Sequence, residues 1–463
     1  MAAPFDALRR ILDAAGVDPE HATDVAITGA DPVLPTPFRM AGAGAAALAA
    51  VGLAATALWR IRGGGAQEIA IDAHHAALAM RAITYLALED GRRGDDWDPI
   101  SGFYQGVDNR WIQLHCQFPH FRDGVLGLLG CSHDREAVAA AIAQRHAAEL
   151  EDELAHNGLP GFMARTADEW AAHPQGQAVA ALPLLEIIRI GDAPPEPLPM
   201  ADRPLSGINV LDLTRVIAGP TVGRTLAEHG AEVLRISGPD LPFLEPLVID
   251  TGHGKRAAEI DLGSADGRRQ LEALVKDAAV FSQSYRPGAL AARGFGPDDL
   301  AAIRPGIVCV SLDAWSHAGP WSERRGYDTL VQCATGLVDA QSANGAPEHL
   351  PGSPLDYLTG YLGAFGAMVA LGRRAREGGS WHVRLSLAQT AHWFKQLGRV
   401  EGVGDPRDLP VPRPEDFGIE RLRAATAWGP IQFLGPVLHM SETPPRWDRT
   451  ARPLGGDAAA WPE

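Results

Sequence analysis

One carboxylate stands where a buried helix is expected to begin. Asp356 lies in the segment SPLDYLTGYLGAFGAMVAL (353–371), which is nearly all apolar or small after the aspartate. That pattern is typical of a buried helix with Asp356 at its mouth. An aspartate there can cap the helix by accepting hydrogen bonds from free N–H groups. It can equally act as a nucleophile in covalent catalysis, and the residue pattern leaves both roles open.

Cationic residues follow the predicted strands of the second half of the chain. They are Arg215, Lys255, Arg286, Arg293, Arg324 and Arg325. The carboxyl ends of parallel strands meet at one edge of a sheet, so these side chains could converge on an anionic ligand. Each of them is equally compatible with a solvated surface arginine or lysine. A turn at Gly219 could also present helix N–H groups to a phosphate, although it matches neither a GxGxxG motif nor a P-loop.

A cluster of potential metal ligands lies in the first half of the chain. It comprises His115, Cys116, His120, Cys131 and His133. The spacing fits no zinc template, so we expect these residues to pack and predict no metal site. The sequence has no GxSxG elbow either, and a hydrolase triad therefore has no anchor.

The charge balance argues against a nucleic-acid partner. The chain has 57 acidic and 41 basic residues, a net charge of −16, and a duplex-binding protein needs a basic face. Four scattered cysteines do not make a disulfide scaffold. The N-terminal MAAPFDALRRILDAAG has charges where an export signal needs an apolar core. We therefore expect a cytoplasmic protein.

The second half alternates strand and helix patterns. INVLDLTRV (208–216) predicts a strand, AGP (218–220) a turn, TVGRTLAEHG (221–230) a helix and AEVLRI (231–236) a second strand. The alternation continues to GIVCVSL (306–312). It predicts an α/β fold with a Rossmann-like parallel sheet and helices on both faces. Strand and helix patterns over 108–158 predict a smaller α+β lobe.

Two segments 314 residues apart resemble each other. At that shift, the uncharged stretch 40–59 and the Gly-Gly at 64–65 align with 354–373 and the Gly-Gly at 378–379. Both copies predict an apolar helix, a glycine stop and a short strand. The stretch 40–59 has the length of a membrane span, but its Ala and Gly residues drive insertion weakly. The repeat favours a buried helix, and we expect no membrane partner.

The second half resembles the family III CoA-transferases, the group that includes formyl-CoA and carnitine CoA-transferases. The resemblance rests on seven segments in family order: GINVLDLTRVIAGP, GAEVLRI, GKRAAEIDL, FSQSYRPGALAARGF, IRPGIVCVSL, GYDTLVQCATGL and PLDYLTG. It implies that Asp356 is the nucleophile and that coenzyme A is a substrate, with no permanently bound cofactor. The substrate- and CoA-binding residues that it and the charge pattern suggest are Arg215, Ile217, Ala218, His253, Lys255, Ser284, Tyr285, Arg286, Arg325, Tyr327 and Asp328. Ser237-Gly238 depart from the family pattern near the nucleotide.

The resemblance implies transfer of CoA between an acyl-CoA and a small carboxylic acid, through an Asp-linked anhydride and an aspartyl-CoA thioester. Two alternatives stay open: an acyl-CoA racemase or isomerase, and a catalytically silent CoA-binding scaffold. Racemases of this superfamily usually carry His where Tyr327 stands, which favours the transferase. The acyl group and the acceptor acid are not predicted.

The proline-rich stretch 192–204 predicts a linker. Residues 1–191 resemble a partial, degenerate family copy that includes the small-domain equivalent. The resemblance implies that residues 205–400 form the CoA-binding domain, and 401–463 resemble the family's C-terminal end. At the 314-residue shift Gly42 aligns with Asp356, so the first copy lacks the nucleophile and we expect at most one active site per chain. Family members form interlocked dimers, and a homodimer is one expectation for this chain.

Overall fold

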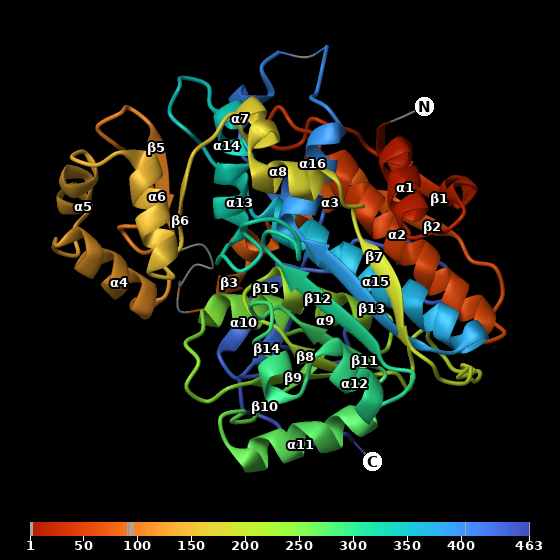
Figure 1. Ribbon diagram of the computed structural model, residues 1–463. Coiled ribbons are helices and arrows are strands. Elements are labelled where there is room, and N and C mark those ends of the chain that lie inside the picture. The colour runs from red at the N-terminus through yellow and green to blue at the C-terminus, as the bar shows by residue number, and fades with distance from the viewer. Residues whose placement is uncertain (1–2, 90, 92–96, 403, 463) are drawn as a thin grey trace.

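A seven-stranded sheet forms the centre of the computed structural model, which describes residues 3–89, 91, 97–402 and 404–462 (Figure 1). Its spatial order is β10 (Lys255–Glu259), β9 (Glu232–Ser237), β8 (Asn209–Leu213), β11 (Val280–Gln283), β12 (Val308–Asp313), β13 (Ser380–Ser386) and β7 (Glu186–Gly191). All neighbours pair in parallel except β7, which is antiparallel to β13. Taken in chain order, the parallel strands follow the 3-2-1-4-5-6 arrangement of a doubly wound sheet. The predicted fold class is confirmed.

Helices cover both faces of this sheet because successive strand residues point to opposite sides. Val210 and Val310 pack toward α9 (Ala218–Glu228) and α15 (Pro354–Glu377). Leu211 and Cys309 pack on the other face, toward α11 (Ala265–Lys276) and α12 (Pro297–Ile303). The all-apolar strands of the sequence reflect this burial on both sides.

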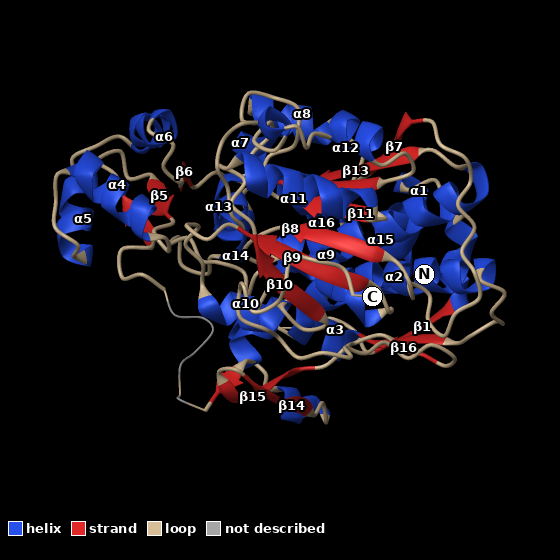
Figure 2. Cartoon of the chain, turned by 90° about the horizontal axis from the view of Figure 1, so that it is seen from below, coloured by secondary structure: helices blue, strands red, loops and turns tan. Residues whose placement is uncertain are grey.

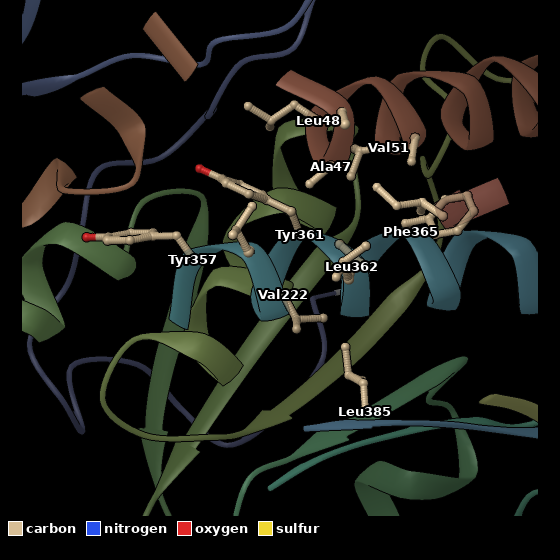
Figure 3. Close-up of a cluster of buried hydrophobic side chains, with 14 of the residues drawn as sticks. Ala47, Leu48, Val51, Val222, Tyr357, Tyr361, Leu362, Phe365 and Leu385 are labelled. Atoms are coloured by element: carbon tan, nitrogen blue, oxygen red, sulfur yellow. The ribbon is translucent and has the colours of Figure 1, made fainter. Parts of the chain in front are cut away.

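Helix α15 lies between the sheet and α2 (Met40–Ile61), as Figure 3 shows for Leu362 and Phe365 facing Ala47 and Val51. Small residues let α15 approach α9 closely. A Cβ added to Gly360 would lie 2.5 Å from the Thr221 Cβ and 2.6 Å from the Ala218 carbonyl oxygen. Glycine at this position therefore lets the second turn of α15 reach the first turn of α9.

Replacing Gly360 with alanine is expected to force these helices apart. Overpacking of this kind costs about 1–3 kcal/mol of folding free energy. A shift at the start of α15 would also displace Asp356, one turn away. Denaturant unfolding checks the stability change. Gly372→Ala in the same helix is the matched control, since its Cβ would meet nothing closer than 3.7 Å. Equal effects of the two variants would contradict the close-approach argument.

A smaller α+β lobe projects from the side of the main body (Figure 1). Its antiparallel sheet consists of β4 (Gly102–Gln105), β5 (Trp111–Leu114) and β6 (Gly161–Met163). Helices α4 (Pro119–Leu129), α5 (Arg135–Ile142) and α6 (Ala147–His156) pack on it around their own apolar core. The predicted lobe is confirmed, and its segment 135–158 forms two helices.

The other α-helices and strands are distributed over both halves of the chain. They are α1 (Ala3–Ala14), β1 (Val25–Thr28), β2 (Ile69–Asp72), α3 (Ala73–Ala79), β3 (Ala87–Leu88), α7 (Ala167–Ala172), α8 (Pro174–Ala180), α10 (Glu245–Thr251), α13 (Asp328–Ala334), α14 (Leu337–Gln341), α16 (Leu387–Gln396), β14 (Arg421–Thr426), β15 (Gly429–Leu434) and β16 (His439–Met440). β14, β15 and β3 form a separate sheet at the edge of the molecule (Figure 2). β16, near the C-terminus, pairs with β2, while β7 of the first half pairs with β13.

The 314-residue repeat has a counterpart in the packing. α2 begins at Met40 and α15 at Pro354, which is the equivalent position. A Cβ on Gly52 would meet Ile69 and Leu438, and one on the equivalent Gly366 would meet Val383 and Leu185. Val383 is the equivalent of Ile69 in this register. The two helices therefore pack on their strands through the same contacts, with strands β16 and β7 in matching antiparallel positions.

α2 is long and apolar enough to cross a membrane, yet 89% of its most apolar 18-residue stretch is buried inside the fold. A buried core helix can be as long and as apolar as a membrane-spanning helix.

One expectation for the second half is wrong. The segment 218–220 is the first turn of α9, because proline is tolerated where the helix N–H groups have no partner, and the turn lies just before it at 216–217.

Candidate active site

A cavity of about 670 Å³ opens at the carboxyl ends of β8 and β11. These strands lie side by side, but their following helices cover opposite faces of the sheet. A ligand site at such a switch point is typical of doubly wound folds. Asp356 lies in the wall of the cavity, and the small lobe contributes Phe118 and His120 to the opposite side.

Two helix starts meet at Asp356. The residue belongs to the first turn of α15, and the Ala218 amide of the first turn of α9 donates a hydrogen bond to its carboxylate. The free N–H groups of a helix start carry partial positive charge, which favours a negative group. Asp356 is therefore a carboxylate that accepts from one backbone donor and lines the cavity, with 7% of its surface exposed.

Asp328 fixes the backbone of the same turn. Its Oδ2 accepts a hydrogen bond from the Asp356 N–H at 2.9 Å, and Gln332 donates to its Oδ1. The Leu355 N–H is also bound by this carboxylate. Asp328 is 2% exposed and is absent from the cavity wall, so it caps α15 from behind.

The two carboxyl groups interact electrostatically. Burial raises the pKa of Asp356 well above its usual range, and the nearby charge of Asp328 raises it further. Burial also raises the pKa of Asp328. A group that ionises only at raised pH is a weaker acid and a more basic carboxylate, which suits a nucleophile.

Replacing Asp328 with asparagine is expected to lower the pKa of Asp356. The amide oxygen can still accept from the Asp356 N–H, but the like charge is gone. If ionised Asp356 reacts, the rising limb of the pH–rate profile should move to lower pH by about one unit, equivalent to about 1.4 kcal/mol. Asp313→Asn, which removes another buried carboxyl group of the cavity wall that is not among the groups acting on the pKa of Asp356, serves as the control. A profile that stays in place, or moves to higher pH, would contradict this electrostatic link.

The turn between β8 and α9 is strained. Val216 has a φ of 68°, which β-branched residues rarely adopt, and it lines the cavity. Gly219, in the first turn of α9, could not carry a Cβ, because that atom would lie 2.4 Å from the Thr214 Cβ. The Arg215 N–H donates to the Ser284 Oγ at 3.3 Å and so joins the loops that follow β8 and β11. Strain held by such contacts is common at functional sites.

The structure brings eight of the twelve predicted site residues to this cavity. They are Asp356, Arg215, Ala218, Ser284, Tyr285, Arg286, Arg325 and Tyr327. Arg293, Arg324, Ser237 and Gly238 also line it. The expected convergence of cationic residues at the strand ends therefore holds for the arginines.

Four predicted residues lie away from the cavity wall. Ile217 is buried just before α9, and Asp328 caps α15. Lys255, 1% exposed, donates from Nζ to Asp212 Oδ2 and to the Pro220 carbonyl oxygen, each at 2.6 Å. Burial lowers the pKa of Lys255 to about 8, against the opposing charge of Asp212. His253 stacks on Phe433, with ring centroids 3.9 Å apart.

Two residues of the small lobe were not predicted as site residues. Phe118 and His120 line the cavity, and His115 lies behind it, stacked on Tyr327 with ring centroids 4.1 Å apart. His115 and His120 belong to the cluster predicted to pack. The sequence placed His115 and His120 near the end of a predicted strand. That position alone does not indicate that the small lobe docks against the cavity. Across the described residues, no group of three or more His, Cys, Asp or Glu side chains could share one metal ion.

Comparison with known proteins identifies the family. A family model described as CoA-transferase family III matches residues 205–402. An acyl-CoA transferase of Gibberella moniliformis is 30% identical over 405 residues, which cover 77% of this chain and 70% of that protein. The human succinyl-CoA:glutarate CoA-transferase is 30% identical over 180 residues, covering 36% of this chain and 41% of the human protein.

A solved structure of a hypothetical protein from Mycobacterium tuberculosis is 29% identical, with a TM-score of 0.40 and coverage of 42% of this chain and 58% of that one. The chain thus spans between 41% and 70% of the length of these proteins. The relative covered over 70% of its length at 30% identity, together with the matching family model, shows that this chain belongs to CoA-transferase family III.

Proposed function

We propose that the protein transfers CoA between an acyl-CoA thioester and a carboxylic acid, with Asp356 as the nucleophile. The observation that carries the proposal is the position of this carboxylate at the switch-point cavity, bound by the Ala218 amide and surrounded by arginines. Family membership and the transferase names of the relatives support the same reaction. The acyl-CoA and the acid are the partners of this reaction, and no other cofactor is needed for it.

The proposed sequence has four steps. An Asp356 oxygen attacks the thioester carbonyl carbon, the C–S bond breaks, and a mixed anhydride and CoA thiolate form. The thiolate then attacks the Asp356 carbonyl carbon, giving an aspartyl-CoA thioester and releasing the donor carboxylate. The acceptor carboxylate attacks this thioester, expels the thiolate and forms a second anhydride. The thiolate finally attacks the acceptor carbonyl, which yields the new acyl-CoA and frees Asp356. Protons balance throughout, and the anhydride retains the energy of the thioester.

Amide donors near Asp356 would stabilise the charge that develops on the attacked carbonyl oxygens. The Ala218 amide already points at the carboxylate. Arg286 and Arg293 line the cavity in the segment after β11, where they can bind phosphates of CoA. Ser284, Tyr285 and Arg325 complete this part of the wall.

Intact-protein mass spectrometry after incubation with a panel of acyl-CoA thioesters tests the function. A mass gain of an acyl group or of CoA, trapped by hydroxylamine or borohydride, would support covalent transfer. CoA binding without any adduct across a broad panel would overturn the anhydride mechanism. Exchange of the substrate α-proton with deuterated water would instead identify a racemase, for which His120 and Asp356 are two of the proton-handling groups that line the cavity.

We further propose that residues 1–191 are a partial copy of the same unit. The matched helix starts and the matched contacts of Gly52 and Gly366 support this origin. Asp31 supports it too: its carboxylate accepts from the Ala41 and Gly42 N–H groups at 2.8 Å, as Asp328 binds Leu355 and Asp356. An aspartate caps the helix start in both copies, although Asp31 and Asp328 are not equivalent in the 314-residue register. The first copy lacks the nucleophile, so we propose one active site per chain, in a reducing cytoplasmic compartment.

Cutting the chain in the linker is expected to leave the halves associated. Met200 is 83% exposed and offers a position for an inserted protease site. β7 and β16 pair across the two halves, and Arg62 holds the linker through the Pro199 and Pro204 carbonyl oxygens at 2.6 and 2.8 Å. Native size-exclusion chromatography of the cut protein should show co-elution, and denaturant should separate the fragments. Separation under native conditions would contradict the interlocked arrangement.

A further inference from the structure

A segment without helix or strand forms one wall of the cavity. Residues 314–327, all of them described, join β12 to α13. Six of them line the cavity: Ala314, Ser322, Arg324, Arg325, Gly326 and Tyr327. Neither a strand ladder nor a run of helical hydrogen bonds fixes the shape of this wall segment. Its backbone groups therefore need partners from side chains or from other parts of the chain.

The side chain of Gln175 supplies three of these partners. Gln175 lies in α8, in the first half of the chain, and is fully buried. Its Nε2 donates to the carbonyl oxygens of Trp315 and Ala318, at 2.7 and 2.9 Å. Its Oε1 accepts from the Trp321 N–H at 2.7 Å. Both N–H groups and the oxygen of this amide are thus used, and one side chain fixes both ends of the span 315–321.

The wall segment is shaped around this amide. Gly319 has a φ of 88°, and a Cβ there would lie 2.4 Å from the Gln175 Oε1. Ser316 has a φ of 87°, a conformation that residues other than glycine keep only where surrounding contacts hold them. Its N–H donates to the Asp313 Oδ1 at 2.5 Å. The conformation of this backbone therefore depends on the contacts that surround it.

Trp315 carries the constraint to the cavity. Its side chain is 1% exposed, and its indole N–H donates to the Arg325 carbonyl oxygen at 3.1 Å. A Cβ on Gly326 would lie 2.9 Å from the same indole nitrogen, so the backbone beside Arg325 passes close to the Trp315 ring. Arg325 and Tyr327, on either side of this contact, line the cavity. Their positions therefore depend on Trp315, whose own carbonyl oxygen is bound by Gln175.

We propose that Gln175 and Trp315 are positioning residues for the proposed CoA transfer, on which this inference rests. They hold the wall segment so that Arg325 and Tyr327 meet the bound thioester. Gln175 belongs to residues 1–191, whereas the wall segment and Asp356 belong to the second half. The first half therefore sets the shape of the substrate site in addition to packing against it.

Two substitutions test this role. Gln175→Leu removes all three hydrogen bonds and leaves their backbone partners unpaired. The KM for an acyl-CoA that labels the protein should rise about tenfold, the effect of losing one hydrogen bond to a charged group. The kcat should change by less than about twofold, since Asp356 lies on α15, outside the wall segment. Trp315→Phe, which removes the indole N–H, should raise KM in the same way.

Each variant has a matched control. Gln177→Leu changes an exposed glutamine of the same helix, whose side chain bonds only to the Ala172 carbonyl oxygen. Trp170→Phe trims a buried ring of α7 whose centroid lies 6.3 Å from that of Trp315. Both controls should keep the wild-type KM, even where the loss of packing lowers the stability of the fold.

Limited trypsin digestion reads the wall segment without any substrate. The peptide bonds after Arg324 and Arg325 should be cut at least about tenfold faster in Gln175→Leu and Trp315→Phe than in the wild type, because the segment opens more often. Mass spectrometry identifies the cut by fragments that begin at residue 325 or 326. Digestion of both controls at these bonds should match the wild type.

A lower kcat at the wild-type KM would indicate a smaller fraction of folded protein and would overturn the positioning role. Cutting after Arg324 and Arg325 that is no faster than in the controls would overturn it as well, while CoA transfer itself stands. If the wild-type chain neither becomes labelled nor transfers CoA with any thioester, the proposed function fails and this inference fails with it. The two kinds of failure are therefore distinguishable.

Discussion

Replacing Asp356 with asparagine is expected to abolish covalent labelling by acyl-CoA and to lower kcat by about four orders of magnitude or more, as the loss of a nucleophile does in other covalent enzymes. Asparagine keeps the shape of the side chain. The hydrogen bond to Asp328 is donated by the backbone N–H of residue 356, so the substitution does not remove it. The fold should therefore persist. The amide lacks the negative oxygen that attacks the thioester, so neither the anhydride nor the aspartyl-CoA thioester can form. Intact-protein mass spectrometry and steady-state rates measure both effects.

Asp313→Asn is the matched control for this variant. Asp313 also lines the cavity, and burial raises its pKa to about 7, but its Oδ1 accepts from the Ser316 N–H at 2.5 Å. An asparagine oxygen can accept the same bond. We expect this variant to be labelled as the wild type is. Labelling of the Asp356 variant at the wild-type level would rule out Asp356 as the nucleophile.

Replacing Lys255 with methionine is expected to destabilise the protein by about 3–5 kcal/mol. Lys255 and Asp212 form an ion pair in which each side chain is 1% exposed or less. Removing the ammonium leaves the Asp212 carboxylate buried with the hydrogen bonds from Thr214 and the charge of the buried Arg235 guanidinium. Denaturant unfolding measures the loss. Lys276→Met is the control, since that side chain is 60% exposed and pairs with Glu272 within α11.

Adding Asp212→Asn to the Lys255 variant should recover part of the lost stability, because the buried carboxylate is then no longer left without the ammonium, although buried Arg235 loses the opposing charge of Asp212. Affinity for CoA provides the second readout. If the ammonium contacts CoA, as the family resemblance implies, the single variant would lose CoA affinity with little change in unfolding. The buried pair predicts the opposite pattern: a large change in unfolding and CoA binding that persists below the unfolding transition.

The sequence by itself determined the architecture of the second half. Alternating apolar strands and amphipathic helices of 205–400 leave few arrangements other than a parallel sheet covered on both faces. It also indicated Asp356 and the arginines at the strand ends, since the edge at which parallel strands finish follows from topology. The 314-residue repeat was visible as well, because glycines that allow close packing recur at the same spacing.

Only the tertiary structure decided which residues share the site. Lys255 follows a glycine turn and is cationic, so its sequence context is that of a ligand-binding residue, yet Asp212 from another strand holds it in the core. His120 lies far from Asp356 in the chain, and the docking of the lobe alone brings them to one cavity. The sequence did not show either that β7 of the first half pairs with β13, or that β16 of the second half pairs with β2. Local patterns specify elements through backbone sterics and burial, whereas these contacts depend on long-range packing that no short segment encodes.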